Sequence, residues 1–166
     1  MKIVLETERL YLREFTTEDA QLLVDLNSNP NVTRYTGDGP VNLAEAQKII
    51  LDVILPQYKN KLGRWAVHLK SNHQFIGWCG LKHIVEVDEI DLGYRFFESY
   101  WGKAYATESA LACFNYGIQK LGLKTIVGRA AIENIASRKV LEKTGMSYIG
   151  DDIEHGNKIA KYRFTV

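Results

Sequence analysis

The sequence predicts a single mixed α/β domain, residues 1–166, in which helices cover a mixed β-sheet. Its 166 residues suit one domain. The patterns follow the order strand, two helices, three strands, helix, strand, helix, two strands. Strands that follow one another directly favour antiparallel pairing, and the later strand–helix–strand unit favours a parallel pair. Together these observations predict a mixed sheet with helices packed on it.

The predicted strands are segments in which apolar residues alternate with polar ones or form short runs. In residues 90–96 every second side chain is apolar, so the polar and small residues between them face the opposite side of the sheet. The predicted strands cover residues 9–15, 65–69, 75–81, 90–96, 125–131, 146–150 and 159–166.

The predicted helices begin at capping residues and carry apolar stripes at helical spacing. Thr16 offers a capping hydroxyl, and Asn42 with Glu45 three positions later predicts a capping box. Pro56 is expected to bend or end the second helix, and Gly145 to stop the last. The predicted helices cover residues 16–29, 42–56, 103–120 and 135–144.

Composition excludes several classes of protein. Lys and Arg total 21 against 20 Asp and Glu, a net charge of +1 that argues against a broad nucleic-acid-binding surface. Apolar residues make up 46% and aromatic residues 11%, far above the content of a disordered chain. No apolar run approaches the ~18 residues of a membrane span. Glu6 also follows the first apolar residues too early for a signal peptide.

The two cysteines, Cys79 and Cys113, are too few for a disulfide framework and fit buried apolar positions. We therefore expect a cytoplasmic protein with no membrane or nucleic-acid partner. The four histidines have no metal-ligand spacing, so no metal site is expected. Phosphate-loop, dinucleotide and nucleophile-elbow motifs are absent from the sequence.

The segment after the strand at 90–96 carries the chemical signal. Small residues at Gly102, Ala104 and Ala106 surround the start of a helix. The first turn of a helix has free N–H groups and a positive dipole end, which together can hold a pyrophosphate. Small residues at a helix start also serve packing, so the pattern alone leaves both interpretations open.

Four segments, in order and spacing, resemble the GNAT acyl-CoA N-acyltransferases over nearly the whole chain. The likeness is greatest to the branch that includes the ribosomal-protein alanine and serine N-acetyltransferases. The segments are ERLYLR (8–13), IGWCGL (76–81), LGY (92–94) with YWGKAYATE (100–108), and NIASRKVLEKTGM (134–146).

The resemblance implies a GNAT-like fold, with a mostly antiparallel mixed sheet, one splayed parallel strand pair and about four helices. It also implies transfer of an acetyl group from acetyl-CoA to a primary amine, either a protein N-terminus or a small molecule, in a monomer or homodimer. A non-catalytic acyl-CoA-binding or sensor domain remains the alternative, because two family motif positions differ. An unrelated α/β interaction module does not explain four ordered matches.

The resemblance places the pyrophosphate of the cofactor at residues 99–104. The family pattern Gln/Arg-x-x-Gly-x-Gly/Ala corresponds to Ser99, Gly102 and Ala104, so the long polar residue is replaced. The pantetheine arm is expected between splayed strands 90–96 and 125–131. Lys103 also fits a solvated lysine, and Asn134 a helix cap. The implied cofactor-binding residues are Gly93, Tyr94, Arg95, Phe96, Trp101, Gly102, Lys103, Ala104, Tyr105, Ala106, Thr107, Asn134, Ser137 and Lys139.

The chemistry requires an amine to lose a proton before it attacks the thioester. An α-amine, with a pKa of about 7.7–8.0, needs less help from a base than a lysine near 10.4. Asp91 is the first candidate base and Glu89 the second, although both also fit solvated acids at a strand edge. A backbone N–H between Gly93 and Arg95 is expected to stabilise the oxygen that gains charge.

The resemblance places a tyrosine that protonates the leaving thiolate in many GNAT enzymes at Leu141, where that acid is missing. Ser137 lies one turn earlier on the same helix face and is expected to serve instead, a surface hydroxyl being the alternative. The variable front half is expected to line the acceptor pocket. The candidate acceptor residues are Arg34, Tyr35, Trp65 and Trp78.

Overall fold

The computed structural model describes all 166 residues and is built around one eight-stranded sheet in the order β1-β2-β3-β4-β5-β6-β8-β7. β5 and β6 run parallel, and every other neighbouring pair is antiparallel. The predicted mixed sheet is therefore confirmed. The strands are β1 (Ile3–Glu6), β2 (Leu10–Glu14), β3 (Gly63–Leu69), β4 (Phe75–Ile84), β5 (Glu89–Phe96), β6 (Thr125–Ala131), β7 (Ser147–Glu154) and β8 (Asn157–Thr165).

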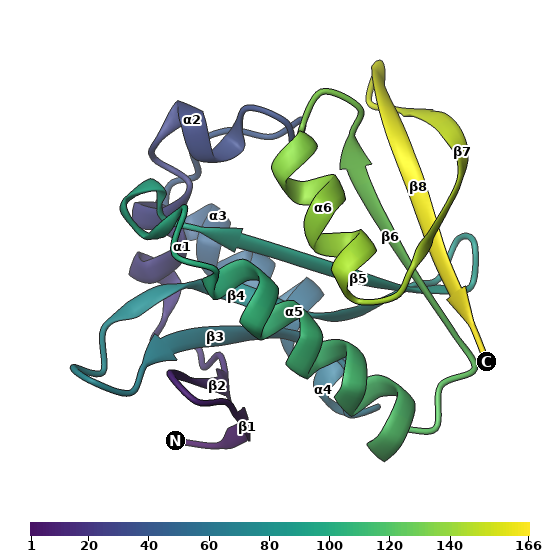
Figure 1. Ribbon diagram of the computed structural model, residues 1–166. Coiled ribbons are helices and arrows are strands. Elements are labelled where there is room, and N and C mark those ends of the chain that lie inside the picture. Colours follow the sequence, from purple (N-terminus) through teal and green to yellow (C-terminus); the bar gives the residue numbers. More distant parts are fainter.

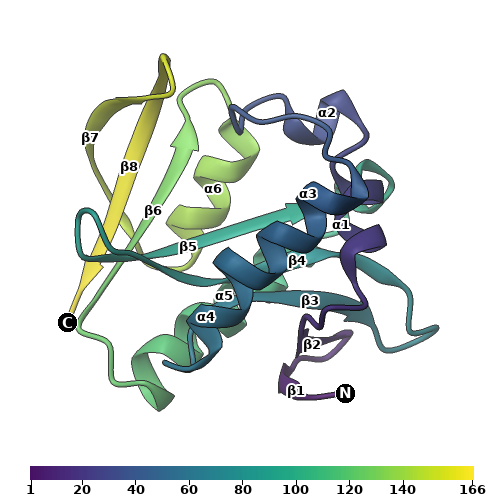
Figure 2. The same cartoon turned by 180° about the vertical axis from the view of Figure 1, so that it is seen from behind.

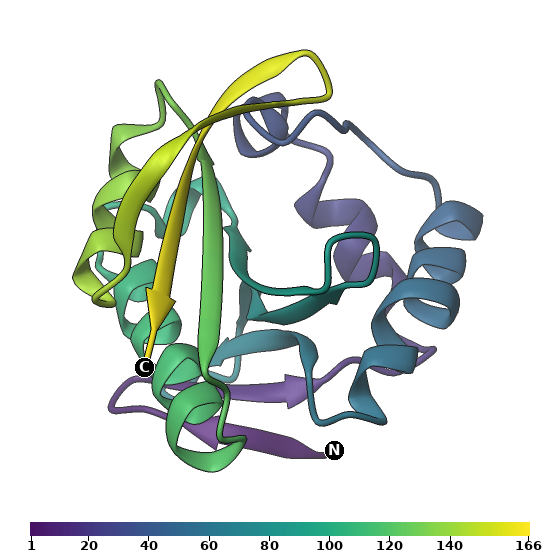
Figure 3. The same ribbon diagram turned by 90° about the vertical axis from the view of Figure 1, so that its right-hand side faces the viewer.

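Helices cover both faces of the sheet. α5 and α6 lie on one face, and α1, α3 and α4 lie on the other (Figures 1 and 2; Figure 3 shows the layers from the side). None of the helices combines the length and apolar composition needed to cross a bilayer. The helices are α1 (Ala20–Leu26), α2 (Pro30–Thr33), α3 (Leu43–Ile49), α4 (Leu55–Tyr58), α5 (Tyr105–Asn115) and α6 (Ile135–Lys143), with π-helical η1 (Ile50–Ile54) and η3 (Tyr116–Lys120) and 3₁₀-helical η2 (Glu98–Tyr100).

Four elements differ from the prediction. β1 and α2 were not predicted, since each has four residues and is too short to show a period. The second predicted helix continues past Pro56, because a π-helical segment precedes it and Pro56 stands in the first turn of α4, where its missing N–H is not needed. The expected cap at Thr16 is absent. Helix α1 begins at Ala20, and the Asp19 carboxylate instead binds Arg13 and the Thr16 N–H.

Two buried clusters hold the helices to the sheet. One joins β3, β4 and β5 to α5 and α6, and the other joins the opposite face to α1, α3 and η1. Cys79 on β4 and Cys113 on α5 are fully buried in the first cluster with their Sγ atoms 3.6 Å apart. Burial, with Cys79 nearby, raises the pKa of the Cys113 thiol.

The parallel strands β5 and β6 separate after two paired positions. The register joins only Asp91 with Val127 and Leu92 with Gly128. Beyond these two pairs, β5 and β6 point in different directions and move apart (Figure 1). The edge of β5 that faces β6 is therefore without a strand partner over residues 93–96, as expected for a splayed pair.

Candidate active site

A cavity of about 1360 Å³ opens where β5 and β6 separate. Its walls come from β5, the start of α5, β6 and α6, together with the chain around α2 and the β7–β8 turn. Of the predicted site residues, those lining it are Arg34, Tyr35, Trp78, Asp91, Gly93, Tyr94, Arg95, Phe96, Trp101, Gly102, Ala104, Tyr105, Ala106, Thr107, Asn134, Ser137 and Lys139. Those that do not line it are Lys103, Glu89 and Trp65.

One end of the cavity is the start of α5. Gly102 and Ala104 have left-handed backbone conformations, with φ of +74° and +65°. The first hydrogen bond of the helix runs from the Glu108 N–H to the Ala104 carbonyl at 3.0 Å. The N–H groups of Tyr105, Ala106 and Thr107 therefore have no intrahelical acceptor. A methyl group on Gly102 would meet nothing within 4 Å. Free N–H groups beside open space at a helix start fit a phosphate ligand.

Side-chain hydrogen bonds hold the loop before α5 in place. Trp101 donates its Nε1–H to the Phe96 carbonyl at 3.0 Å, which ties the loop to the end of β5. The Glu98 carboxylate accepts from the side-chain amides of Asn29 and Asn31, at 2.8 and 3.1 Å. The loop is thus anchored on both sides of the cavity without using the cavity-facing N–H groups.

Lys103 is outside the cavity. Its carbonyl accepts a hydrogen bond from the Arg9 guanidinium at 2.9 Å, and its ammonium lies 5.6 Å from the centre of the Tyr100 ring. The structure therefore fits the alternative of an outward lysine better than a phosphate contact.

Helix α6 brings Ser137 to the cavity opposite β5. The Tyr94 hydroxyl on β5 donates to Ser137 Oγ at 3.0 Å. The Asn134 side chain lines the cavity and caps α6 by accepting from the Ser137 N–H at 3.2 Å, which leaves its amide N–H₂ without an acceptor from the protein. Burial raises the pKa of Tyr94, so its hydroxyl stays protonated as a donor. Tyr94, expected as a cofactor-binding residue, thus also makes a polar contact with Ser137.

Asp91 lies beside Gly93 on the same face of β5. Its Oδ1 accepts from Arg129 Nη1 on β6 at 2.7 Å. A methyl group on Gly93 would lie 3.6 Å from Asp91 Oδ2, so this second oxygen faces the floor of the cavity. Burial raises the pKa of Asp91 to about 6, against the charges of Arg129 and Arg64, which lower it. Asp91 is therefore ionised near neutral pH yet can accept a proton.

Glu89, the second candidate base, is placed differently. Its carboxylate pairs with Arg129 at 2.6 Å, Lys161 at 2.8 Å and Arg163 at 3.4 Å. Burial raises its pKa, but the hydrogen bonds and charges of Lys161 and Arg129 outweigh this and leave the pKa lowered. A carboxylate held by three cations outside the cavity is a poor proton acceptor, so the geometry favours Asp91.

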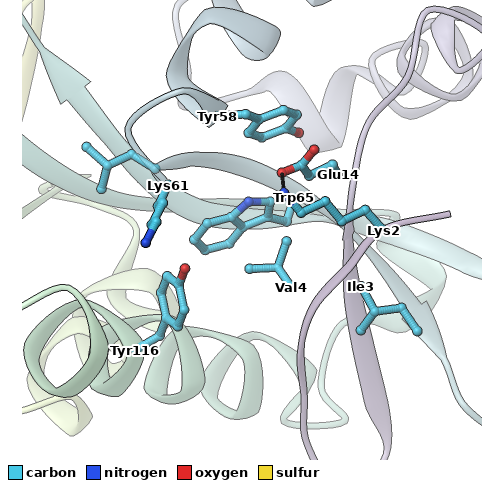
Figure 4. A pocket seen from close by; sticks show the side chains of 9 residues that line it. Lys2, Ile3, Val4, Glu14, Tyr58, Lys61, Trp65 and Tyr116 are labelled. Carbon is cyan, nitrogen blue, oxygen red and sulfur yellow. Dashed lines mark ion pairs between the residues drawn. The ribbon is translucent and has the colours of Figure 1, made fainter.

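The acceptor candidates divide between the two faces of the sheet. Trp78 lies in the cavity, and its Cζ3 would be 3.7 Å from a methyl group on Gly93. Trp65 instead lies on the opposite face, because the strand alternation turns it towards the α5 side. There it lines a separate cavity of about 290 Å³ with Tyr58 and Tyr116 (Figure 4). The structure does not place Trp65 at the acceptor site.

The sequence prediction missed Arg64 and Arg129, which also line the cavity. Arg129 stands in a strand that was expected beside residues 90–96, so its nearness to Asp91 could have been found from that pairing. Arg64 precedes the predicted strand at 65–69, and its position depends on the register of three strands. No local pattern indicated it.

Comparison with known proteins identifies the family. The model of the "Acetyltransferase (GNAT) domain" matches residues 9–147. The chain belongs to the GNAT acetyltransferase family. It is similar to the "Uncharacterized N-acetyltransferase YoaA" of Bacillus subtilis (strain 168), with 30% identity over 149 residues, or 89% of this chain and 84% of the relative. This protein is accordingly an N-acetyltransferase.

Solved acetyltransferases share the fold. The "RimL- Ribosomal L7/L12 alpha-N-protein acetyltransferase" in complex with coenzyme A has a TM-score of 0.82 and 16% identity, over 99% of this chain and 98% of that one. The spermidine N-acetyltransferase of Vibrio cholerae, in complex with CoA and spermine, has a TM-score of 0.80 and 19% identity, over 96% of each chain. As a member of the GNAT acetyltransferase family this N-acetyltransferase uses acetyl-CoA as co-substrate, and the free N–H groups at the start of α5 suit it.

Proposed function

We propose that this N-acetyltransferase transfers the acetyl group of acetyl-CoA directly to a primary amine bound over Gly93. The observation that supports this most strongly is the joining of two features in one cavity. The free N–H groups of α5 lie at one end, and the Asp91 carboxylate lies beside the bare backbone of Gly93 at the other. The RimL and spermidine enzymes act on a ribosomal protein and on spermidine, so the fold accepts both large and small amines.

The proposed co-substrate contacts are made mainly by backbone. The N–H groups of Tyr105, Ala106 and Thr107 would hold the pyrophosphate, and the unpaired edge of β5 over residues 93–96 would hydrogen-bond the pantetheine arm. Acetyl-CoA supplies the acetyl group as a thioester. The free amide of Asn134 offers one further donor at the C-terminal end of β6.

Asp91 is the proposed proton acceptor. Arg129 fixes the carboxylate through Oδ1, which leaves Oδ2 to take the proton that the amine loses. With a pKa of about 6 this carboxylate is mostly ionised at neutral pH, and is more basic than an ordinary aspartate.

Ser137 is the proposed hydrogen-bond donor to the leaving sulfur. Because Ser137 Oγ already accepts from the Tyr94 hydroxyl, its own hydrogen is directed elsewhere, and Ser137 lines the cavity. A thiol with a pKa of about 8.5 is a fair leaving group, so one hydrogen bond is adequate support.

Release of free thiol from acetyl-CoA in the presence of an amine panel tests the proposal. We expect amine-dependent thiol release and an acetylated amine by mass spectrometry. If acetyl-CoA raises the Tm but no amine or peptide is ever acetylated, the proposed reaction is wrong.

A further inference from the structure

Two arginines and a tryptophan form one wall of the cavity next to Gly93. Trp78 on β4 pairs directly with Arg95 on β5, and Arg64 on β3 is aligned with Gly93 through Gly80. The Arg64 guanidinium carbon stacks 4.2 Å from the centre of the Trp78 ring, and that of Arg95 lies 5.7 Å away. Since Gly80 has no side chain, nothing from the intervening strand separates Arg64 from Gly93. Arg64 and Gly93 are two strand spacings apart, about 10 Å between Cα atoms.

Of the two arginines of this wall, Arg95 pairs with Asp38, whereas Arg64 has no acidic partner. Its hydrogen bond with Tyr58 is accepted by its backbone carbonyl and does not involve the guanidinium. Its guanidinium, which has five N–H donors, contacts the face of Trp78 and borders the cavity without a hydrogen bond or ion pair. Burial lowers the pKa of Arg64 while the more distant Asp91 raises it, and an arginine remains charged under these conditions.

Arg95 supplies a second unused donor on the same wall. Its Nη1 donates to Asn27 Oδ1 at 2.6 Å, and its Nη2 pairs with Asp38 at 3.2 Å. Its Nε is the one buried side-chain nitrogen or oxygen of the whole chain without a partner. Buried donors are nearly always satisfied in folded proteins. Beside this buried donor, the Arg64 guanidinium borders the cavity with no acceptor from the protein, so this wall fits a ligand that brings acceptor oxygens.

We propose that Arg64, stacked on Trp78, binds a carboxylate of the acceptor, which makes the acceptor a small amino acid. This inference rests on the proposed function, because it assigns the second group of the amine that Asp91 deprotonates. The planar fork of a guanidinium matches a carboxylate with two parallel hydrogen bonds, and the indole face holds that fork in place. The acceptor would then lie across the sheet, with its amine over Gly93 and its carboxylate towards β3.

The acids of the cavity argue against a polyamine in this protein. Asp38 pairs with Arg95, and Asp91 and Glu154 both pair with Arg129. The fourth acid of the cavity, Glu98, has no cationic partner, but it lies on the loop before α5, where it binds Asn29 and Asn31, and not on the wall of Arg64. A second ammonium group would therefore meet Arg64 with no unpaired acid on that wall to bind it. The charge arrangement favours an acceptor with one amine and one carboxylate.

Matched acceptors and a charge-removing variant test the inference. The panel contains glycine, β-alanine, γ-aminobutyrate and the common L-amino acids, each compared with its carboxamide, together with simple alkylamines. Wild type should prefer the carboxylate over the carboxamide by about 10- to 100-fold in kcat/KM, mainly through KM, as expected for hydrogen bonds to a charged group. Arg64→Gln should remove this preference, because it lowers kcat/KM for the amino acids much more than for their carboxamides. Arg64→Lys should keep part of it.

A control and the contrary outcomes separate the two proposals. Lys59→Gln removes one exposed positive charge and should leave the preference intact. If alkylamines and carboxamides are acetylated as well as the amino acids, or if Arg64→Gln slows both groups equally, the carboxylate site is wrong and the proposed acetyl transfer stands. If no amine of any kind is acetylated, the proposed transfer fails, and this inference fails with it.

Discussion

The proposed co-substrate end of the cavity presents free backbone N–H groups, whereas the proposed acceptor end presents side chains from four neighbouring strands. At the co-substrate end the free donors are N–H groups of consecutive residues at the start of α5. At the acceptor end, β3, β4, β5 and β6 contribute Arg64, Trp78, Asp91 and Arg129, one residue each. The two ends meet at Gly93.

This difference has a consequence for how each end responds to substitution. A site made of N–H groups depends on chain conformation, so it is sensitive to a few backbone positions and tolerant of most side chains. A site made of side chains can change its specificity through one residue while the sheet stays the same. The predictions below test that contrast.

The largest effect is expected at Gly102. Gly102→Val places a branched side chain into the space beside the free N–H groups, and its φ of +74° disfavours any β-branched residue. The variant should lose the rise in Tm that acetyl-CoA gives to wild type. Gly122→Val is the matched control, because Gly122 has a φ of +67° and equally open surroundings away from the cavity. Equal stabilisation of the two variants by acetyl-CoA would contradict the assignment of the phosphate site.

Asp91 should have the next largest effect. Asp91→Asn keeps an oxygen for Arg129 but cannot accept a proton, so kcat should fall by about 100-fold or more with little change in acetyl-CoA affinity. In wild type, kcat should decline as the pH falls through about 6, because the carboxylate becomes protonated below its raised pKa. Steady-state kinetics from pH 5 to 9 should show this decline of kcat at low pH in wild type and not in Asp91→Asn.

Glu89→Gln is the matched control on the same strand. It removes an acid that lies outside the cavity, so kcat should change only a few-fold. The decline of kcat below about pH 6 should persist. A loss of kcat as large as that of Asp91→Asn would reverse the choice between the two acids.

A smaller effect is expected at Ser137. Ser137→Ala removes the proposed donor to sulfur and should lower kcat by about 10-fold, with acetyl-CoA affinity close to wild type. Tyr94→Phe keeps Ser137 but removes the hydrogen bond that orients its hydroxyl group. The kcat of this variant should therefore fall less than that of Ser137→Ala. Unchanged turnover in Ser137→Ala would show that this hydroxyl takes no part in the reaction.

The smallest effect on activity separates the two tryptophans. Trp78→Phe narrows the surface on which Arg64 stacks and should raise the KM of the acceptor a few-fold. Trp65→Phe should leave KM and kcat unchanged while lowering stability by about 1–3 kcal/mol, since Trp65 is buried on the other face. Denaturant unfolding and kinetics on both variants measure the two effects. An acceptor KM that changes in Trp65→Phe alone would contradict the placement of the two faces.

Much of the fold could be predicted because the signals are local. The strand at 125–131 and the capping box of Asn42 and Glu45 agree with the structure, since alternation and capping depend on residues close in sequence. The helix start near Gly102 was likewise identified from consecutive small residues. Short elements such as β1 escaped because four residues show no period.

The acceptor end was harder to predict because its contacts join distant strands. Glu89 and Asp91 share a face and both remained candidate bases in the sequence, with Asp91 first. In the structure, Lys161 and Arg163 on β8 bind Glu89 and leave Asp91 to the cavity. Trp65 and Arg64 are neighbours in sequence, yet the strand pleat sends them to opposite faces. Only the register of β3, β4 and β5 decides which of them can meet an acceptor.

The buried position of Cys79 and Cys113 keeps the protein's own thiols from interfering with an assay that detects free thiol. A dye that reacts with thiols would report the coenzyme A released by turnover, because the protein's two thiols are enclosed between α5 and the sheet. The same dye, added without substrate, would react with the two cysteines only when the protein unfolds and exposes them. One reagent can therefore measure catalysis in the folded enzyme and record the rate of its unfolding.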